Sequence, residues 1–480
     1  MIPPASNGRP IVLWFVLLAL ALRVFTFLPA VIDHDESTYL VIADSLLKGH
    51  TYFVDYIDTK PIGIFLLYAG LMSLFGKSIV ILRLVVALLV ALTAYLLYRA
   101  KFAHDGHHQS ALWVGGLYIF ITSTFTFFGV SPNTELFFNV FTALSLWLIL
   151  AHPTIWAYGL AGLSLGCGFV IKYVVAFDAL AFGLFLLWLA YLKKRNWWTT
   201  LIGCSLMVIG FAIPFGLVWW YYWSQGLEEP FLFYSFQVSS RYPNTRTLEV
   251  YTVFVLDFLV HFLPVTLLFF YSLFSKKIPT LTRQLSGLWG LLTMLIVLLP
   301  GKRFGHYFIQ FMLPYCWLAG SFFMIQPSPL PAWLQKALSP PWSFRLLAFI
   351  TALISFLQLA DYLGKPDHPR NIANYLRDRL EVEDRIYMAN DQIVYHLLDR
   401  ASPIPYVHPS LFWEPKHIAA LEIDVAQELE KIYAAQPRYV VLRKKPKDER
   451  LSPWLQEFYT RDTLIDDKSV IYRRKVKGSF

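Results

Sequence analysis

Carboxylate side chains gather in one short segment of a chain that is otherwise poor in them. The first 361 residues hold 14 acidic side chains, and six of these lie between positions 33 and 61. They are Asp33, Asp35, Glu36, Asp44, Asp55 and Asp58. Apolar sequence flanks the segment on both sides, so we expect these groups to handle a substrate more than to balance surface charge.

Asp35 is the candidate for acid–base chemistry in this segment. Asp33 and Glu36 are three residues apart, which is the spacing of a capping box at the start of a helix. Asp35 would then occupy the second helical position, where the positive end of the helix dipole favours an ionised carboxylate. Such a carboxylate can accept a proton from a substrate. The alternative is an acidic residue that only stabilises the helix start.

Lys60 is the first cation that could hold an anionic substrate. It follows Asp58 by two residues and precedes Pro61, where the sequence becomes apolar again. The lysine could bind a phosphate, and Asp58 could bind a sugar hydroxyl or a metal ion. The structural alternative is an ion pair at the membrane interface, with the lysine reaching out to water.

Further polar side chains stand at the ends of apolar runs. Lys172 follows one such run and could hold an anionic lipid headgroup or reach out to water. Asn133 and Glu135 precede another run, where they could bind substrate or only cap a helix. Arg241, in a long polar loop, is a weaker candidate of the same kind.

A short turn near position 300 carries two adjacent cations. Lys302 and Arg303 precede His306 and Tyr307. The orientation derived below places this turn outside the cell, where basic residues run against the positive-inside rule. A phosphate ligand would explain them.

The composition places these residues in a polytopic membrane protein. Of the 480 residues, 56% are hydrophobic and 15% are charged, against about 25% charged in soluble domains. Apolar runs near 20 residues can span a bilayer, and we identify eleven. They cover residues 11–29, 78–98, 111–129, 134–151, 155–172, 174–192, 200–223, 251–273, 285–300, 307–325 and 344–361.

Basic residues fall in alternate loops between these runs, which predicts a cytoplasmic N-terminus. An odd number of spans then places the C-terminal region on the extracytoplasmic side. The segment 33–61 and the loops 131–133, 224–249 and 300–307 fall on that same side. The polar loops that carry candidate site residues therefore share one face of the membrane.

The polar segments have predicted structures of their own. Tyr39, Ile42, Ala43 and Leu46 recur at helical spacing, which predicts an amphipathic helix on the membrane surface that ends at Lys48-Gly49. Residues 61–75 could form a second interfacial helix.

We expect two domains, a membrane domain over 1–361 and a soluble extracytoplasmic domain over 362–480. The second range contains 20 basic and 18 acidic residues. It predicts a small α/β module with helices over 371–380, 391–400 and 423–435 and strands over 385–388, 438–442 and 470–473. Nothing in it indicates catalysis, so an accessory or acceptor-docking role is expected.

A carboxylate base together with cations at membrane depth fits one reaction in particular. The base would take the proton of an acceptor hydroxyl. The cations would stabilise the negative charge that develops on a departing lipid phosphate. The sequence therefore predicts transfer of a sugar from a lipid-linked sugar phosphate.

The order of these motifs resembles the GT-C membrane glycosyltransferases, in the branch with protein O-mannosyltransferases, aminoarabinose transferases and lipopolysaccharide galacturonosyltransferase-like proteins. The resemblance covers roughly residues 10–325. The residues that carry it are Asp35-Glu36 with Tyr39, Asp58-x-Lys60-Pro61, Asn133-Thr134-Glu135, Gly166-x-Gly168-x-x-x-Lys172, Lys302-Arg303, His306-Tyr307 and Pro314.

The resemblance implies a helical GT-C body and an inverting transferase of the bacterial inner membrane that uses a polyprenyl-phosphate sugar, with Asp35 as the base. The acceptor would be a hydroxyl of lipid A or the lipopolysaccharide core, another polysaccharide, a lipid or a protein. Some relatives use a divalent metal ion. Here His50, Asp55 and Asp58 could supply ligands, although their spacing is not diagnostic.

Two other readings fit a chain with many spans. A secondary transporter would show internal repeats and polar groups at the bilayer midplane, and we find neither pattern. A non-catalytic lipid-binding or assembly protein with the same body is the second alternative.

Overall fold

The structure is a computed structural model that describes residues 8–241, 247–301, 304–325, 329–337, 342–444 and 450–475. The chain forms two compact units. The helical unit comprises Met1–Phe27, Val80–Tyr221 and Asn244–Ala360, and the mixed unit comprises Leu28–Ile79, Tyr222–Pro243 and Asp361–Phe480. The polar segment 33–61 is thus part of the same compact unit as the C-terminal module, whereas the predicted boundary at 361 had assigned it to the membrane domain.

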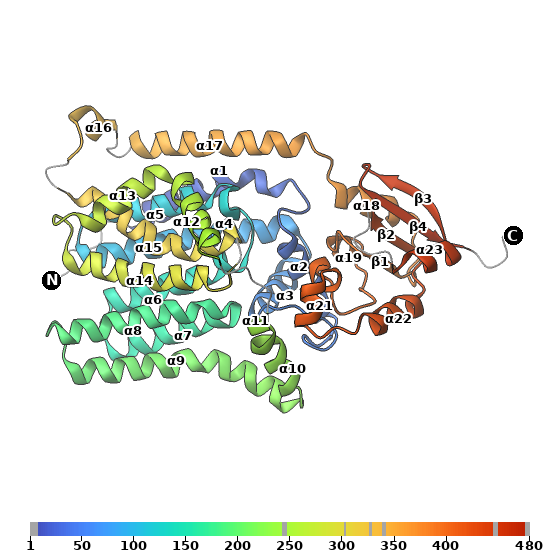
Figure 1. Cartoon of the computed structure of the whole chain (residues 1–480). Coiled ribbons are helices and arrows are strands. Elements are labelled where there is room, and N and C mark those ends of the chain that lie inside the picture. Colours follow the sequence, from blue (N-terminus) through green and yellow to red (C-terminus); the bar gives the residue numbers. More distant parts are fainter. Residues whose placement is uncertain are drawn as a thin grey trace. The chain divides into compact units, whose positions relative to one another are not determined.

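The helical unit is built mainly from long apolar helices, with the six-residue α16 as an exception (Figure 1). Their bounds are α1 Gly8–Arg23, α4 Ile79–Asp105, α5 His108–Thr122, α6 Thr134–Ala151, α7 Ile155–Ile171, α8 Ala176–Tyr191, α9 Trp197–Ser224, α12 Leu248–His261, α13 Leu263–Phe274, α14 Thr280–Leu298, α15 Phe308–Ser321, α16 Ala332–Ala337 and α17 Trp342–Leu363. Each of the eleven predicted apolar runs falls on one of these helices or on a consecutive pair.

Within the described residues, seven helices are long and apolar enough to cross a membrane. They are Pro10–Phe27, Ile79–Asp105, Thr134–Ala151, Tyr173–Tyr191, Trp197–Ser224, Thr280–Leu298 and Gly305–Met324. The remaining predicted runs lie on shorter helices or on the bent pair described next. The predicted class, a helical polytopic membrane protein with a small C-terminal α/β part, is confirmed.

The predicted run 251–273 is not one straight helix. It consists of α12 and α13, whose axes differ by 101°. Pro264 lies in the first turn of α13, where it cannot donate a backbone hydrogen bond to the preceding turn. The proline therefore ends α12 and allows the sharp bend.

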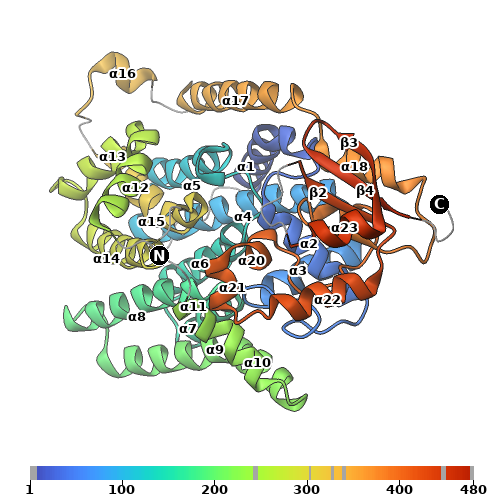
Figure 2. The same cartoon turned by 45° about the vertical axis from the view of Figure 1, so that its right-hand side comes forward.

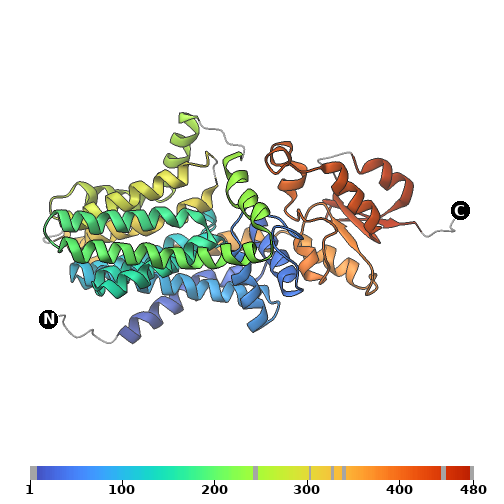
Figure 3. The ribbon, with the colours of Figure 1, turned by 90° about the horizontal axis from the view of Figure 1, so that it is seen from below.

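Glycines allow α7 and α9 to approach closely. A Cβ on Gly162 would come within 2.0 Å of the Met207 carbonyl oxygen, and one on Gly210 within 2.2 Å of the Gly159 oxygen. Small residues at such crossings are the usual means by which membrane helices bring their backbones together. Figure 3 shows the long helices of this unit running roughly parallel to one another.

Arg23 is a charged residue inside the first span, and its hydrogen bonds stabilise it there. Its side chain is buried, and its guanidinium donates to the carbonyl oxygens of Thr122 at 2.6 Å, Gly129 at 3.1 Å and Val130 at 2.9 Å. These carbonyls lie at or beyond the end of α5, where they have no partner within the helix. Arg23 is therefore a structural group.

The mixed unit begins with α2 His34–Leu47 and α3 Gly63–Phe75. Lys48 is the C-cap of α2 and Gly49 has φ 87°, so the predicted end at Lys48-Gly49 is confirmed. The prediction of an amphipathic surface helix is wrong, because residues 36–45 of α2 are all buried. The helix packs against α3 and against α19 Ile393–Leu397.

Asp44 helps to fasten α2 to the C-terminal module. Its carboxylate lies 2.7 Å from Lys77 Nζ and 2.5 Å from His396 Nδ1. Lys77 also reaches Asp399 at 2.7 Å. This carboxylate therefore has a structural task.

The C-terminal module contains a four-stranded sheet of order β1-β2-β4-β3. Its strands are β1 Ile386–Met388, β2 Tyr439–Arg443, β3 Tyr459–Ile465 and β4 Ser469–Arg474. β1 and β2 are parallel, and the other pairs are antiparallel. β1, β2 and β4 match the predicted strands.

The helices of this module, and two that precede it in the mixed unit, are short. Their bounds are α10 Glu228–Leu232, α11 Val238–Arg241, α18 His368–Arg377, α20 Pro409–Trp413, α21 Pro415–Ala420, α22 Val425–Ala435 and α23 Ser452–Phe458. Figure 2 shows α18 and α23 beside the sheet, and both contact β3.

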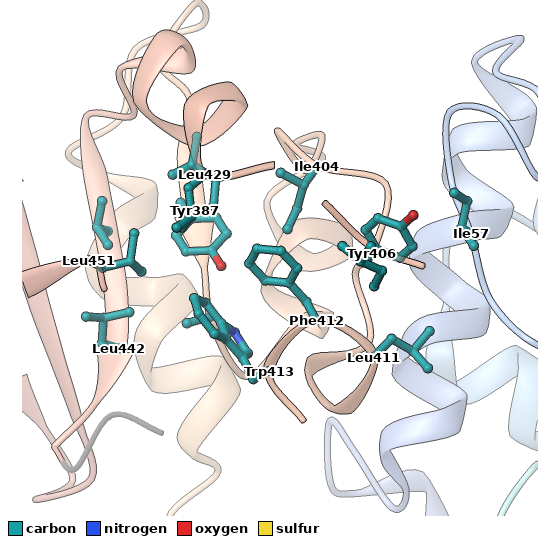
Figure 4. Packing of buried hydrophobic residues seen from close by; sticks show 14 of the residues in the cluster. Ile57, Tyr387, Ile404, Tyr406, Leu411, Phe412, Trp413, Leu429, Leu442 and Leu451 are labelled. Atoms are coloured by element: carbon teal, nitrogen blue, oxygen red, sulfur yellow. The ribbon is translucent and has the colours of Figure 1, made fainter. Parts of the chain in front are cut away.

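One apolar core joins distant parts of the mixed unit (Figure 4). Phe412, Tyr387 and Leu429 from the C-terminal module pack in the same cluster as Ile57 and Val238. These two residues come from the first polar segment and from the chain after α9. Apolar burial thus holds residues 28–79 against the C-terminal module.

Removal of the Phe412 ring should destabilise this unit strongly. Phe412 is 1% exposed, and Phe412→Ala should lower the free energy of unfolding by about 3–5 kcal/mol, because it removes buried contacts and leaves a cavity. Thermal or denaturant unfolding in detergent measures the change. Phe458→Ala is the matched control, since Phe458 is 45% exposed. Equal effects of the two substitutions would contradict the core assignment.

Candidate functional site

Asp35 and Lys60 form the centre of a polar cluster in the mixed unit. Lys60 Nζ donates to Asp35 Oδ1 at 3.0 Å, and the two side chains are 18% and 15% exposed. The first turn of α2 places Asp35, and the turn before α3 places Lys60. The structure therefore joins two of the predicted site residues in a partly accessible ion pair.

Asp58 and Tyr52 shape the turn that carries Lys60. Asp58 Oδ1 accepts from the backbone N–H groups of Thr59 at 2.6 Å and Lys60 at 3.2 Å, and Lys60 Nζ lies 3.4 Å away. The Tyr52 hydroxyl donates to the carbonyl oxygens of Asp58 and Lys60. The Asp58 side chain is 2% exposed. Its observed contacts are those of a residue that forms the turn.

The start of α2 has the predicted cap with one difference. Asp33 is the N-cap residue, and its side chain accepts from the Asp35 N–H. Glu36 accepts from the N–H of Ile32 at 3.2 Å, one residue earlier than a capping box requires. Tyr39, one turn after Asp35, donates to Asp35 Oδ2 at 3.5 Å.

His408 is a member of this cluster that the sequence analysis missed. Its Nε2 lies 3.7 Å from Asp35 Oδ1, and the imidazole is 18% exposed. His408 belongs to the C-terminal module, where it is the N-cap of α20. The only local signal is a histidine before Pro409-Ser410 at a helix start, and this signal does not indicate the distant partner.

The helical unit holds a second cluster, formed by Glu135, Lys172 and Tyr307. Glu135 lies in the first turn of α6 and is 1% exposed, and its carboxylate pairs with the ammonium of Lys172, the C-cap of α7. Lys172 Nζ also lies over the Tyr307 ring, 4.1 Å from its centroid. The His306 ring centroid is 4.8 Å from that of Tyr307. Four predicted residues thus lie in one cluster.

The other predicted residues have different positions. Asn133 is buried and occupies the N-cap position of α6. Arg241 pairs with Glu422 of the C-terminal module, so its observed partner is a structural one. Lys302 and Arg303 lie outside the described residues.

The three suggested metal ligands do not come together in one group among the described residues. Within the described parts of the chain, no group of three or more His, Cys, Asp or Glu side chains could hold a metal ion. His50 Nδ1 lies 3.6 Å from Asp55, whose carboxylate accepts the Thr51 N–H. Asp58 forms the turn at Lys60 instead.

His368 has contacts that resemble a hydrolytic triad in the C-terminal module. Its Nδ1 lies 2.9 Å from Asp466 Oδ2 and its Nε2 lies 3.0 Å from Ser469 Oγ. Ser469 is fully buried, so a substrate could not reach its hydroxyl. The group ties α18 to the turn between β3 and β4.

The chain is similar to known membrane glycosyltransferases in part of its sequence and in its fold. Residues 59–220 match the family model of dolichyl-phosphate-mannose-protein mannosyltransferases. The crystal structure of ArnT from Cupriavidus metallidurans bound to undecaprenyl phosphate is similar over 98% of this chain and 99% of that chain, with 16% identity and a TM-score of 0.68. The structure of the arabinofuranosyltransferase AftD from Mycobacteria matches 98% of this chain and 40% of that chain, with 14% identity and a TM-score of 0.51. The curated proteins contain no significant match.

These findings confirm the predicted resemblance to the GT-C membrane glycosyltransferases. The chain has the GT-C fold, and part of it matches the mannosyltransferase family model. It is an integral membrane protein by its fold and its apolar helices.

The Glu135–Lys172 pair should be energetically coupled. Glu135→Gln removes the carboxylate from a largely buried lysine, which is 14% exposed, and should lower the free energy of unfolding by about 3–5 kcal/mol. The double variant Glu135→Gln/Lys172→Met should recover part of this loss, because it also removes the buried charge. The free energies of unfolding of Glu135→Gln, Lys172→Met and the double variant complete a double-mutant cycle. Strictly additive effects would show that the pair is not coupled.

Proposed function

We propose that this chain is an inverting glycosyltransferase. It would move a sugar from a polyprenyl-phosphate donor to a hydroxyl of a cell-envelope acceptor, with Asp35 as the general base. One observation carries the proposal. The other five carboxylates of the segment 33–61 cap a helix, shape a turn or fasten α2, whereas Asp35 faces Lys60 and His408 in a partly accessible cluster.

The proposed step conserves atoms and charge. The acceptor hydroxyl oxygen attacks the anomeric carbon of the donor sugar, and its proton passes to the Asp35 carboxylate. The bond between the anomeric carbon and the phosphate oxygen breaks, and the polyprenyl phosphate leaves with the electron pair. Attack opposite to the leaving phosphate inverts the configuration at that carbon.

Lys60 would link donor binding to the strength of the base. Its ammonium stabilises the ionised form of Asp35, which keeps the carboxylate charged but also makes it a weaker base. An incoming phosphate would compete for the same ammonium. As Lys60 turns to the phosphate, Asp35 would gain basicity when the donor is in place.

The basic side chains of the helical unit would bind the donor phosphate. Lys172 and His306 are described members of this set, and Tyr307 packs against both. Lys302 and Arg303 stay predictions for the same role. Cations near a departing phosphate stabilise the charge that develops in the transition state.

The donor class draws support from the ArnT structure, which contains undecaprenyl phosphate and has the same fold. The acceptor could be lipid A or the lipopolysaccharide core, another polysaccharide, a lipid or a protein. We place the reaction on the extracytoplasmic face of the bacterial inner membrane, because the basic loops predict that side for the segment 33–61.

Asp35→Asn should abolish transfer while the donor still binds. The amide cannot accept the proton of the acceptor hydroxyl, and loss of a general base typically costs about 10²–10⁴-fold in turnover. The assay measures the transfer of labelled sugar from each of a panel of polyprenyl-phosphate sugars to acceptors in envelope extracts. Donor binding is measured separately.

Asp33→Asn is the matched control, because it removes the same charge two residues away and asparagine is an equally good N-cap. This variant should retain most of the activity. Wild-type turnover in Asp35→Asn membranes would remove Asp35 from its role as the base.

A further inference from the structure

His408 brings the C-terminal module to the proposed base. The domain to which it belongs was expected to be accessory, yet its imidazole faces the first turn of α2. Nε2 is 3.7 Å from Asp35 Oδ1, which is longer than a hydrogen bond. Contacts of catalytic groups are often long before substrate binds and shorten in the complex.

The hydrogen bonds of His408 define which nitrogen carries the proton. The Ser410 backbone N–H donates to Nδ1 at 3.3 Å, and the Ser410 hydroxyl lies 2.8 Å from the same nitrogen. A nitrogen that accepts from a backbone N–H carries no proton of its own. In the neutral ring the proton is therefore on Nε2, the nitrogen that faces Asp35.

The surroundings favour the neutral ring. Burial lowers the pKa of His408 below its usual value, and the nearby carboxylates of Asp35 and Asp58 only partly oppose this effect. The neighbours Lys60 and His34 act in the same direction as burial. These four groups come from α2 and from the turn before α3, and Ser410 is the contact from the histidine's own segment.

We infer that His408 is a positioning residue for the Asp35 base, supplied by the C-terminal module through its Nε2–H. The inference rests on the proposed function for the role of Asp35. An N–H directed at Oδ1 stabilises the ionised carboxylate and restrains its orientation. The module would thus contribute directly to the reaction centre of the mixed unit.

Three variants test this contact. His408→Phe keeps a ring and removes the N–H, and His408→Gln keeps an N–H donor near the position of Nε2. His417→Phe is the control, because His417 is buried and its Nδ1 lies 2.8 Å from the Ser410 carbonyl oxygen. It perturbs the same segment at a different histidine.

Two readouts are needed. Infrared difference spectroscopy follows the protonated carboxyl band of Asp35 during a pH titration, and Asp35→Asn identifies the band. The pH dependence of kcat, with KM for the donor, follows the same group during transfer.

Loss of an N–H that favours the carboxylate raises the pKa of that carboxylate. In His408→Phe the infrared midpoint and the acidic limb of kcat should both move to higher pH, by about one unit. Above that limb kcat should fall about tenfold, with the donor KM unchanged. His408→Gln should restore most of kcat, and His417→Phe should leave both midpoints in place.

The two readouts separate the inference from the proposed function. An unchanged infrared midpoint in His408→Phe would overturn the inference, whatever the activity. The same midpoint shift in His417→Phe would also overturn it, because the effect would come from packing. Absence of transfer by the wild-type protein would overturn the proposed function, while the infrared titration would still decide whether His408 acts on Asp35.

Discussion

A lysine shared between two carboxylates holds the polar part of the mixed unit together. Lys60 lies 3.0 Å from Asp35 and 3.4 Å from Asp58, so one ammonium joins the start of α2 to the turn before α3. Partly buried charges are stable only when they are paired. The cluster is therefore formed before any substrate binds, and on the proposed function an anionic ligand that competes for Lys60 would raise the basicity of Asp35.

The helical unit follows the same rule. Glu135 and Lys172 come from the ends of two apolar helices, and each neutralises the other in a largely buried pair. Ionisable groups at membrane depth are costly unless they are paired or functional. On the proposed function the two explanations combine, because an incoming phosphate would recruit the cation that the carboxylate holds.

Local chemistry in the sequence predicted much of this arrangement. The cap at Asp33, the end of α2 and the strands β1, β2 and β4 all depend on short-range patterns, and the structure has them. β3 was missed because only one of its residues is buried and because it carries Arg461 and Asp462, a pattern that resembles a loop and suits an edge strand. His408 was missed because its role depends on tertiary packing that no local pattern encodes. For the same reason α2, predicted at a membrane surface, is buried on every face.

The most direct measurement is the fate of the donor sugar in proteoliposomes that contain only the purified protein, a labelled polyprenyl-phosphate sugar and a hydroxyl acceptor. The account predicts one polyprenyl phosphate released for each sugar transferred, and a product whose anomeric configuration is opposite to that of the donor. A product with retained configuration would contradict direct attack by an acceptor that Asp35 activates. Transfer from a nucleotide sugar with no use of the lipid-linked donor would contradict the proposed reaction as a whole.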